Sequence, residues 1–150
     1  MTRLLAAALA SSGLLAACTA TVDVTPPGPS PDVAATCRDL AAQLPDVVAF
    51  QDSQPTEPDS ELTSAWGDPA IVFRCGVDVP AALTATSQLI TVDGVDWFPQ
   101  ELTAGYRFTT TGRTANVEVS VPDDYAPEAE ALVDLAQAVG DTVPLITAAP

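Results

Sequence analysis

The sequence contains no lysine and no histidine, and all five of its basic residues are arginines. Without histidine the chain has no Ser-His or Cys-His relay and no imidazole ligand for a metal ion. Without lysine it has no Ser-Lys dyad, no Schiff base and no Walker-type phosphate loop. The glycines form neither a G-x-G-x-x-G nor a G-x-S-x-G motif. Carboxylates, hydroxyls and arginines remain, so the composition favours a non-catalytic protein without cofactor or metal, although it leaves room for an enzyme.

The shortage of basic residues also sets the charge. The chain carries 20 acidic residues and a net charge of −15 at pH 7. A surface this negative repels the phosphates of nucleic acids and anionic lipid headgroups. We therefore expect no nucleic-acid partner and no purely electrostatic binding to membranes. The 150 residues are enough for one small domain, in which an additional covalent link is of most use.

The N-terminus has the layout of a secretory signal. Arg3 precedes an apolar stretch at residues 4–15, which is too short for a membrane-spanning helix of about 20 residues. The Leu-Ala-Ala-Cys sequence at residues 15–18 then resembles the bacterial lipobox, in which the cysteine thiol receives lipid and the chain is cleaved before it. We expect a signal peptide at residues 1–17 and lipid, including palmitate, on Cys18, which anchors the protein to the outer side of the cell membrane. The alternative is an ordinary signal peptide with an incidental cysteine.

Prolines dominate the segment that follows Cys18. This composition favours extended polyproline conformations and does not form a core. We expect residues 18–30 to be the lipidated cysteine and a spacer of roughly 40 Å. A single folded domain is expected at residues 31–140, and a frayed tail at residues 141–150.

Two cysteines remain, Cys37 and Cys75. Cys37 lies on the apolar face of a helix predicted from residue 31 to about residue 44, and Cys75 lies in the apolar run at residues 71–77. In a secreted protein two remaining cysteines are expected to pair, and closing a loop of nearly forty residues is worth about 4 kcal/mol. A metal site is the alternative, but two isolated cysteines without histidine do not supply four ligands. We expect a structural disulfide.

Periodic apolar residues predict the remaining elements. Residues 71–77 read as a central strand, and Asp93-Gly94 between β-branched runs predicts a hairpin with a type I′ turn. Residues 51–64 contain two prolines and four acidic residues and predict an exposed loop. Strands or strand pairs are expected at residues 71–77, 89–98, 105–111 and 116–121, and a last helix at residues 127–140.

Consecutive strands joined by short turns favour an antiparallel sheet. Two amphipathic helices can cover one face of such a sheet. We therefore expect an α+β fold, as a two-layer sandwich with a mainly antiparallel sheet of four or five strands and two helices on one face.

Three motifs of the mature chain resemble a known family. They are Trp-Gly-Asp-Pro at residues 66–69, Arg-Cys-Gly at residues 74–76 and Val-Asp-Gly-Val-Asp-Trp at residues 92–97. Together they resemble a family of actinobacterial secreted proteins and lipoproteins that is defined only as a domain of unknown function. The resemblance covers about residues 37–139. It implies a location in the cell envelope and supports the disulfide, but it implies no activity and no catalytic residues.

The preferred function is a non-catalytic envelope lipoprotein that binds a protein, glycan or lipid partner. Exposed aromatic residues beside an arginine are common in interfaces, so the candidate contact surface is Trp66, Arg74, Trp97 and Phe98. The alternative places both tryptophans in the core and pairs Arg74 with an acid of a neighbouring strand, such as Glu118.

A second hypothesis is a carboxylate-dependent hydrolase that acts on envelope polysaccharide. It requires two acidic side chains roughly 5 to 10 Å apart in a cleft. Asp68, Asp96 and Glu118 are the candidate acids associated with strands. A third possibility is a purely structural envelope component without a ligand, which the sequence does not distinguish from the first.

Overall fold

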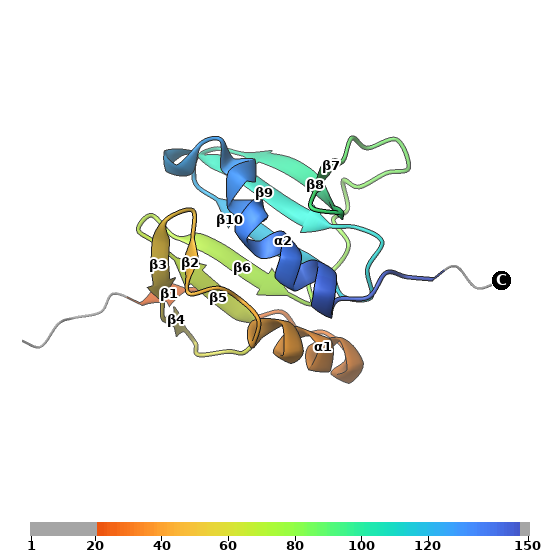
Figure 1. Cartoon of the computed structure of the whole chain (residues 1–150), viewed down its shortest axis with the longest axis horizontal. Helices are drawn as coiled ribbons and strands as arrows, with labels where there is room; N and C mark the ends of the chain where they lie inside the picture. Colours follow the sequence, from red (N-terminus) through yellow and green to blue (C-terminus); the bar gives the residue numbers. More distant parts are fainter. Residues whose placement is uncertain (1–20, 148–150) are drawn as a thin grey trace, which may run out of the picture.

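The computed structural model describes residues 21–147, which form an antiparallel sheet of eight strands crossed by a helix (Figure 1). In their order across the sheet, the strands are β2 (Val47–Val48), β3 (Gln51–Gln54), β5 (Thr63–Trp66), β6 (Ile71–Cys75), β10 (Val117–Val121), β9 (Gly105–Thr110), β8 (Val95–Leu102) and β7 (Ile90–Val92). The remaining elements are the helices α1 (Pro31–Ala41) and α2 (Ala131–Thr142), the 3₁₀ helices η1 (Asp123–Tyr125) and η2 (Glu128–Glu130), and a separate parallel pair of β1 (Val22–Asp23) and β4 (Thr56–Glu57).

The expected α+β class, with an antiparallel sheet and two helices, is confirmed. The expected count of four or five strands is wrong, and the layout is not an even two-layer sandwich. α2 contacts β2, β7, β8 and β10 and so crosses the sheet, whereas α1 contacts the C-terminal part of the molecule through α2 (Figure 1). α1 is also joined to the sheet covalently, because Cys37 Sγ lies 2.02 Å from Cys75 Sγ of β6.

The additional strands come from residues 47–66, much of which was expected to be a loop. β3 is entirely polar and β5 consists of Thr, Ser, Ala and Trp, so neither shows the alternation that marks a half-buried strand. β8 also continues past Pro99, which was expected to end it. Pro99 pairs with Phe108 of β9. β7 begins only at Ile90, opposite Trp97, so the side of Pro99 that lacks an N–H faces an unpaired edge.

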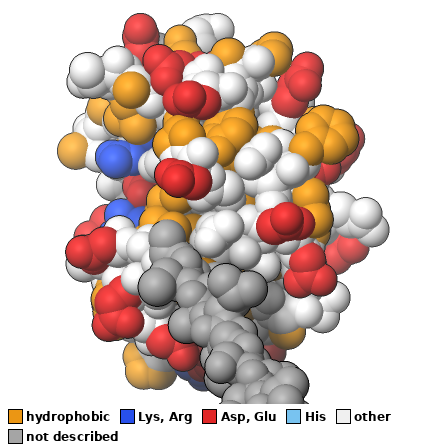
Figure 2. Space-filling model, turned by 90° about the vertical axis from the view of Figure 1, so that its left-hand side faces the viewer, with side chains coloured by type: hydrophobic (Ala, Val, Ile, Leu, Met, Phe, Trp, Pro, Cys, Tyr) orange, Lys and Arg blue, Asp and Glu red, His pale blue; other side chains and the backbone are white. Residues whose placement is uncertain are grey.

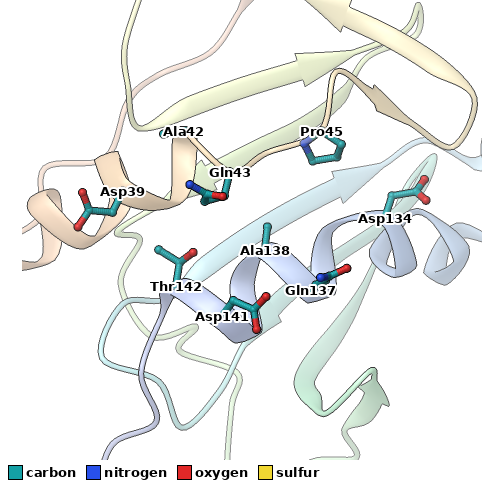
Figure 3. Close-up of a pocket in the computed structure, with 9 residues that line it drawn as sticks. All are labelled: Asp39, Ala42, Gln43, Pro45, Asp134, Gln137, Ala138, Asp141 and Thr142. Carbon is teal, nitrogen blue, oxygen red and sulfur yellow. The ribbon is translucent and has the colours of Figure 1, made fainter.

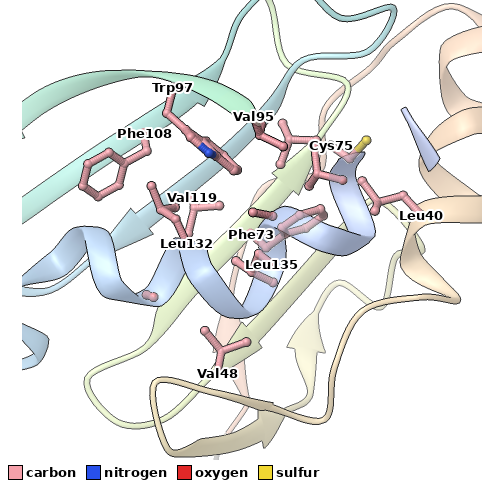
Figure 4. Close-up of a cluster of buried hydrophobic side chains, with 14 of the residues drawn as sticks. Leu40, Val48, Phe73, Cys75, Val95, Trp97, Phe108, Val119, Leu132 and Leu135 are labelled. Carbon is pink, nitrogen blue, oxygen red and sulfur yellow. The ribbon is translucent and has the colours of Figure 1, made fainter. Parts of the chain in front are cut away.

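The core lies between α2 and the sheet (Figure 4). β6 is an interior strand, as expected, and alternates buried and half-buried residues, so that Phe73 points towards α2. Leu132 and Leu135 of α2 pack against Phe73 and Val119 in this cluster. Burial of apolar side chains at this scale is the main stabilising term of a small domain.

The N-terminal segment differs from the expected free spacer. Val22 N–H donates to Pro55 O at 2.9 Å, and Val24 is buried. Pro29 packs against Gly76, where an added Cβ would lie 2.6 Å from Pro29 Cγ. Residues 22–30 therefore belong to the folded domain, because the chain from β1 onward is held by backbone pairing and packing. The expected signal peptide and Cys18 lie outside the described residues.

The C-terminal segment also extends further than expected. α2 continues through Gly140 to Thr142, and Val143 is fully buried. Ile146 N–H donates to Gly112 O at 2.8 Å. Residues 141 and 142 are thus part of α2, and residues 143–146 are attached to the domain by burial of Val143 and by backbone hydrogen bonds to the β9–β10 connection.

Candidate interaction surface

Of the four residues expected from the sequence to form a contact surface, the three aromatic ones are buried and only Arg74 is partly exposed. Trp66 and Trp97 are 1% and 0% exposed, and Phe98 is 9% exposed. Trp66 packs edge-on against Phe73 and its Nε1–H donates to Pro45 O at 3.0 Å. Trp97 lies under α2 in the core. The two-residue period of β5 and β8 points the two indole rings towards the core, so they stabilise the fold and are not available to a partner. Phe98 follows Trp97 on β8 and therefore faces the other side of the sheet, where it is also buried.

Arg74 has the structural role that was considered as the alternative. Its Nη1 lies 3.0 Å from Glu118 Oε1, and its Nε–H donates to Thr25 O at 3.1 Å. Arg107 Nε approaches the other carboxylate oxygen of Glu118 at 3.6 Å. The strand register places Glu118 directly opposite Arg74, so the expected cross-strand pair is confirmed.

The three candidate acids of a hydrolase have different neighbours. Asp96 accepts a hydrogen bond of 2.6 Å from Thr91 Oγ1, and Glu118 is held between two arginines. Asp68 lies in the turn before β6, near Tyr125. Glu118 serves as the acceptor of a cross-strand ion pair, and the structure gives Asp96 and Asp68 separate local partners. This arrangement gives the hydrolase hypothesis no support.

A feature that the sequence analysis missed is the tip of the β2–β3 hairpin. The turn consists of Ala49 and Phe50, with backbone φ angles of +48° and +61°. Two-residue hairpin turns with positive φ at both positions normally contain Asn and Gly, because other residues incur a steric cost there. Phe50 is nevertheless 99% exposed. No Asn-Gly or Asp-Gly pair marks this turn in the sequence, which explains why it was not predicted.

The hairpin tip is held from both sides. Ala49 N–H donates a hydrogen bond of 2.8 Å to Asp134 Oδ2 of α2. Val48, the preceding residue, is fully buried in the core beneath α2 (Figure 4). Gln51 Nε2 also donates to Ala49 O, at 3.4 Å. These contacts fix the backbone that presents the Phe50 ring to solvent.

Further apolar residues surround Phe50. Val47 and Val133 are 45% and 52% exposed. We define the hairpin patch as Val47, Ala49, Phe50, Tyr125, Ala126 and Val133, which with Glu130 and Asp134 line a groove of about 670 Å³. On the side of the molecule near β3, apolar side chains are interspersed with acidic ones (Figure 2).

Tyr125 closes the hairpin patch on the side of the sheet. Its hydroxyl donates to Pro69 O at 2.7 Å. Partial burial raises the pKa of Tyr125 above its ordinary value of 10.0, and the nearby carboxylates of Asp124 and Asp68 raise it further. The neutral, hydrogen-bond-donating form is therefore favoured at this position.

A second groove, of about 780 Å³, continues from the hairpin patch along α2 (Figure 3). Asp134 lines both grooves. In Figure 3, Asp39 and Gln43 lie across the groove from Asp141 and neighbouring residues of α2. We define the acidic groove by its lining residues, Asp39, Ala42, Gln43, Pro45, Asp134, Gln137, Ala138, Asp141 and Thr142. Among the residues that line the two grooves there is no arginine.

Residues 21–147 lack two features that would indicate other kinds of site. In this part of the chain, no group of three or more Asp, Glu, Cys or His side chains is arranged to hold a metal ion. No helix there has the length and apolar character needed to cross a membrane.

The fold and surface define a small, disulfide-linked α+β domain that presents an apolar hairpin tip beside an acidic groove. A family model described as "Protein of unknown function (DUF3515)" matches residues 2–147, and the chain belongs to this family. The expectation that it belongs to a domain of unknown function is thus confirmed, whereas the actinobacterial and lipoprotein details stay predictions. Neither the comparison with curated proteins nor that with solved structures gave a match.

Proposed function

We propose that the protein is a non-catalytic lipoprotein of the cell envelope that binds its partner through the hairpin patch. The observation that carries this proposal is the fully exposed Phe50 on a turn whose two residues both have positive φ. Backbone strain of this kind costs of order 1–3 kcal/mol per residue and is concentrated at functional sites.

The two features are unfavourable for the isolated domain. An exposed aromatic ring contributes no burial of apolar surface to the stability of the core. A turn with Asn and Gly would adopt the same backbone conformation without strain. The hairpin is nevertheless fixed by Asp134 and by the burial of Val48. A rigid, preorganised apolar side chain is what lowers the entropic cost of binding, so the arrangement suits contact with a partner.

The N-terminal connection is short, so a lipid on Cys18 would hold the domain close to the membrane. If Cys18 carries lipid, only residues 19–21 separate it from β1, which begins at Val22. Four residue steps span at most about 14 Å, which is much less than the spacer expected from composition. The domain would then work close to the bilayer, on a partner in or near the membrane.

The tether is tested by metabolic labelling with a lipid probe. We expect label on the wild type and none on the Cys18→Ala variant, with the domain released from the membrane fraction. The Ala17→Gly variant, which keeps a small residue before the cysteine, is the matched control and should retain the label. Equal labelling of wild type and Cys18→Ala would remove the lipoprotein part of the proposal.

The contact surface is tested by site-specific photo-cross-linking in cells. A photoreactive residue at position 50 should give discrete adducts, because Phe50 lies at the proposed contact. The matched control is Val79, which is 62% exposed but lies outside the hairpin patch. Absence of adducts at position 50, or the same adducts from both positions, would contradict the proposed surface.

A further inference from the structure

We propose that the partner is a basic polypeptide segment with an apolar anchor residue, which lies along α2 in the acidic groove and places its anchor on the hairpin patch. This inference rests on the proposed function, because it uses the same exposed Phe50. It adds the chemistry of the ligand and the path that the ligand takes across the domain.

The geometry provides an elongated site. Glu130, which caps α2, and Asp134, Gln137 and Asp141 within α2 recur at intervals of three or four residues and so lie along one side of the helix. From residue 130 to residue 141 a helical rise of 1.5 Å per residue gives a length of about 17 Å. The residues across the groove come from the end of α1 at one end and from the hairpin at the other. A site of this length accommodates about five residues of an extended chain.

The charges of the site select a positive ligand. Four carboxylates, those of Asp39, Glu130, Asp134 and Asp141, line the two grooves, and no arginine lines either of them in the described part of the chain. One oxygen of Asp134 already accepts the Ala49 N–H, which leaves the other oxygen for a ligand. Charge complementarity of this kind steers association and determines specificity more than it adds affinity. Lysine or arginine side chains are the matching groups in a polypeptide.

The apolar end of the site supplies the anchor. Phe50, Val47 and Val133 are exposed around the groove that Asp134 connects to the acidic groove. Aromatic side chains at the centre of an interface dominate its binding energy, whereas exposed ion pairs contribute about 0.2–1 kcal/mol each. A segment that has basic residues and one large apolar residue therefore complements both the acidic groove and the hairpin patch.

The same charges disfavour two other occupants. A second copy of this chain would bring its own Asp39, Asp134 and Asp141 against the same carboxylates, in a protein with a net charge of −15. An anionic lipid surface would meet the same repulsion. Of these three occupants, only a basic segment relieves the repulsion between the carboxylates of the acidic groove.

The test measures binding of synthetic peptides to the immobilised full-length protein at low ionic strength, with a detergent-only surface as blank. The probe is a short peptide of alternating lysine and leucine. The two comparison peptides replace leucine by serine or lysine by glutamate. The Lys-Leu peptide should bind most tightly, and Phe50→Ser should weaken it without affecting the weaker Lys-Ser peptide.

Matched charge variants show whether peptide binding depends on the carboxylates of the acidic groove or on the net charge of the whole protein. The Asp39→Asn/Asp141→Asn double variant should weaken the Lys-Leu peptide roughly 5- to 10-fold, because two exposed ion pairs are lost. The Glu61→Gln/Glu101→Gln variant changes the net charge equally, at exposed residues outside both grooves, and should leave binding within about two-fold. Equal weakening by both double variants, or equal binding of the Glu-Leu peptide, would overturn the inference.

Two further measurements separate this inference from the proposed function. Vesicles with anionic phospholipid and sedimentation of the protein at increasing concentration test the other two occupants. One outcome would overturn the basic-segment inference but keep the hairpin patch as the contact surface. In that outcome Phe50→Ser reduces vesicle binding or self-association and leaves peptide binding unchanged. The photoreactive residue can also be placed at Val47, a neighbouring position of the hairpin patch. If Phe50→Ser changes neither peptide binding, vesicle binding, self-association nor the in-cell adducts at position 47, the proposed function itself fails.

Discussion

The backbone N–H of Ala49 lies 2.8 Å from Asp134 Oδ2, although the two residues are 85 positions apart in the sequence. This bond joins the tip of the β2–β3 hairpin to the outer side of α2. A hydrogen bond to an ionised carboxylate is shorter and stronger than one between neutral groups. It connects the apolar and acidic parts of the surface, because Asp134 lines both grooves.

We predict that Asp134→Ala loosens the hairpin. Loss of one charge-assisted bond at an exposed site should reduce the free energy of unfolding by about 1 kcal/mol, measured by urea denaturation. The Ala49 amide should also exchange its hydrogen faster, because its acceptor is gone. Asp141→Ala, on the same face of α2, is the control; it removes a carboxylate from the last turn of the helix, so it should not lower the free energy of unfolding and should leave exchange of the Ala49 amide unchanged. An unchanged exchange rate in Asp134→Ala would show that the carboxylate does not hold the turn.

We predict that replacing the turn by Asn and Gly stabilises the protein. In the Ala49→Asn/Phe50→Gly variant, residues that tolerate positive φ replace two that do not, so the free energy of unfolding should rise by about 1–2 kcal/mol. Phe50→Ser is the matched control, since it removes the ring but keeps a side chain in the strained conformation, and it should not be stabilising. If the Asn-Gly variant is no more stable than wild type, the turn stores no strain and loses its value as an indicator of function.

We predict that the disulfide is a major source of stability. Cys37 and Cys75 are both fully buried and are separated by 38 residues. Opening this loop in the Cys37→Ser/Cys75→Ser variant should lower the free energy of unfolding by about 4 kcal/mol in denaturant titrations. Cys18→Ser should leave the unfolding curve unchanged, because that thiol belongs to the expected lipid site. A loss below about 1 kcal/mol in the double variant would mean that other contacts hold α1 in place.

We predict a loss of stability in alkaline solution that involves Tyr125. Its pKa is raised in the folded protein above the ordinary value of 10.0, so the folded state favours the protonated phenol. The resulting stabilisation is fully present below pH 10.0 and is lost as the pH rises through the folded pKa. The measurement is the pH dependence of the unfolding midpoint, in which Tyr125→Phe should show a shallower decline above pH 10.0 than wild type. Superimposable profiles would exclude this contribution.

Local patterns in the sequence were sufficient to predict several elements. Asp93 and Gly94 have φ angles of +46° and +78°, as the expected type I′ turn requires, and β7 and β8 pair on either side of it. The strand expected at residues 71–77 is present as the interior strand β6 (Ile71–Cys75). In both cases the residue preferences, the alternation of apolar residues and the turn residues all favour the same element. The structure expected from local sequence is therefore the one that forms.

The candidate surface was harder to predict, because exposure depends on tertiary packing. A tryptophan near an arginine has the same sequence signature whether the ring faces a partner or the core, and α2 covers Trp97. The apolar run Val47-Val48-Ala49-Phe50 gave no strand pattern, since it spans a two-residue strand and a strained turn. Its bond to Asp134 is non-local, so no sequence window contains both partners.

The most direct test of the central claim is whether Phe50 is covered in the living cell. Phe50→Cys and the control Val79→Cys are labelled with a membrane-impermeant maleimide, once on intact cells and once after purification. We predict that both thiols react equally when purified, and that the thiol at position 50 is protected on cells while that at position 79 is not. Equal labelling at the two positions on intact cells would show that the hairpin patch is free, which contradicts the account.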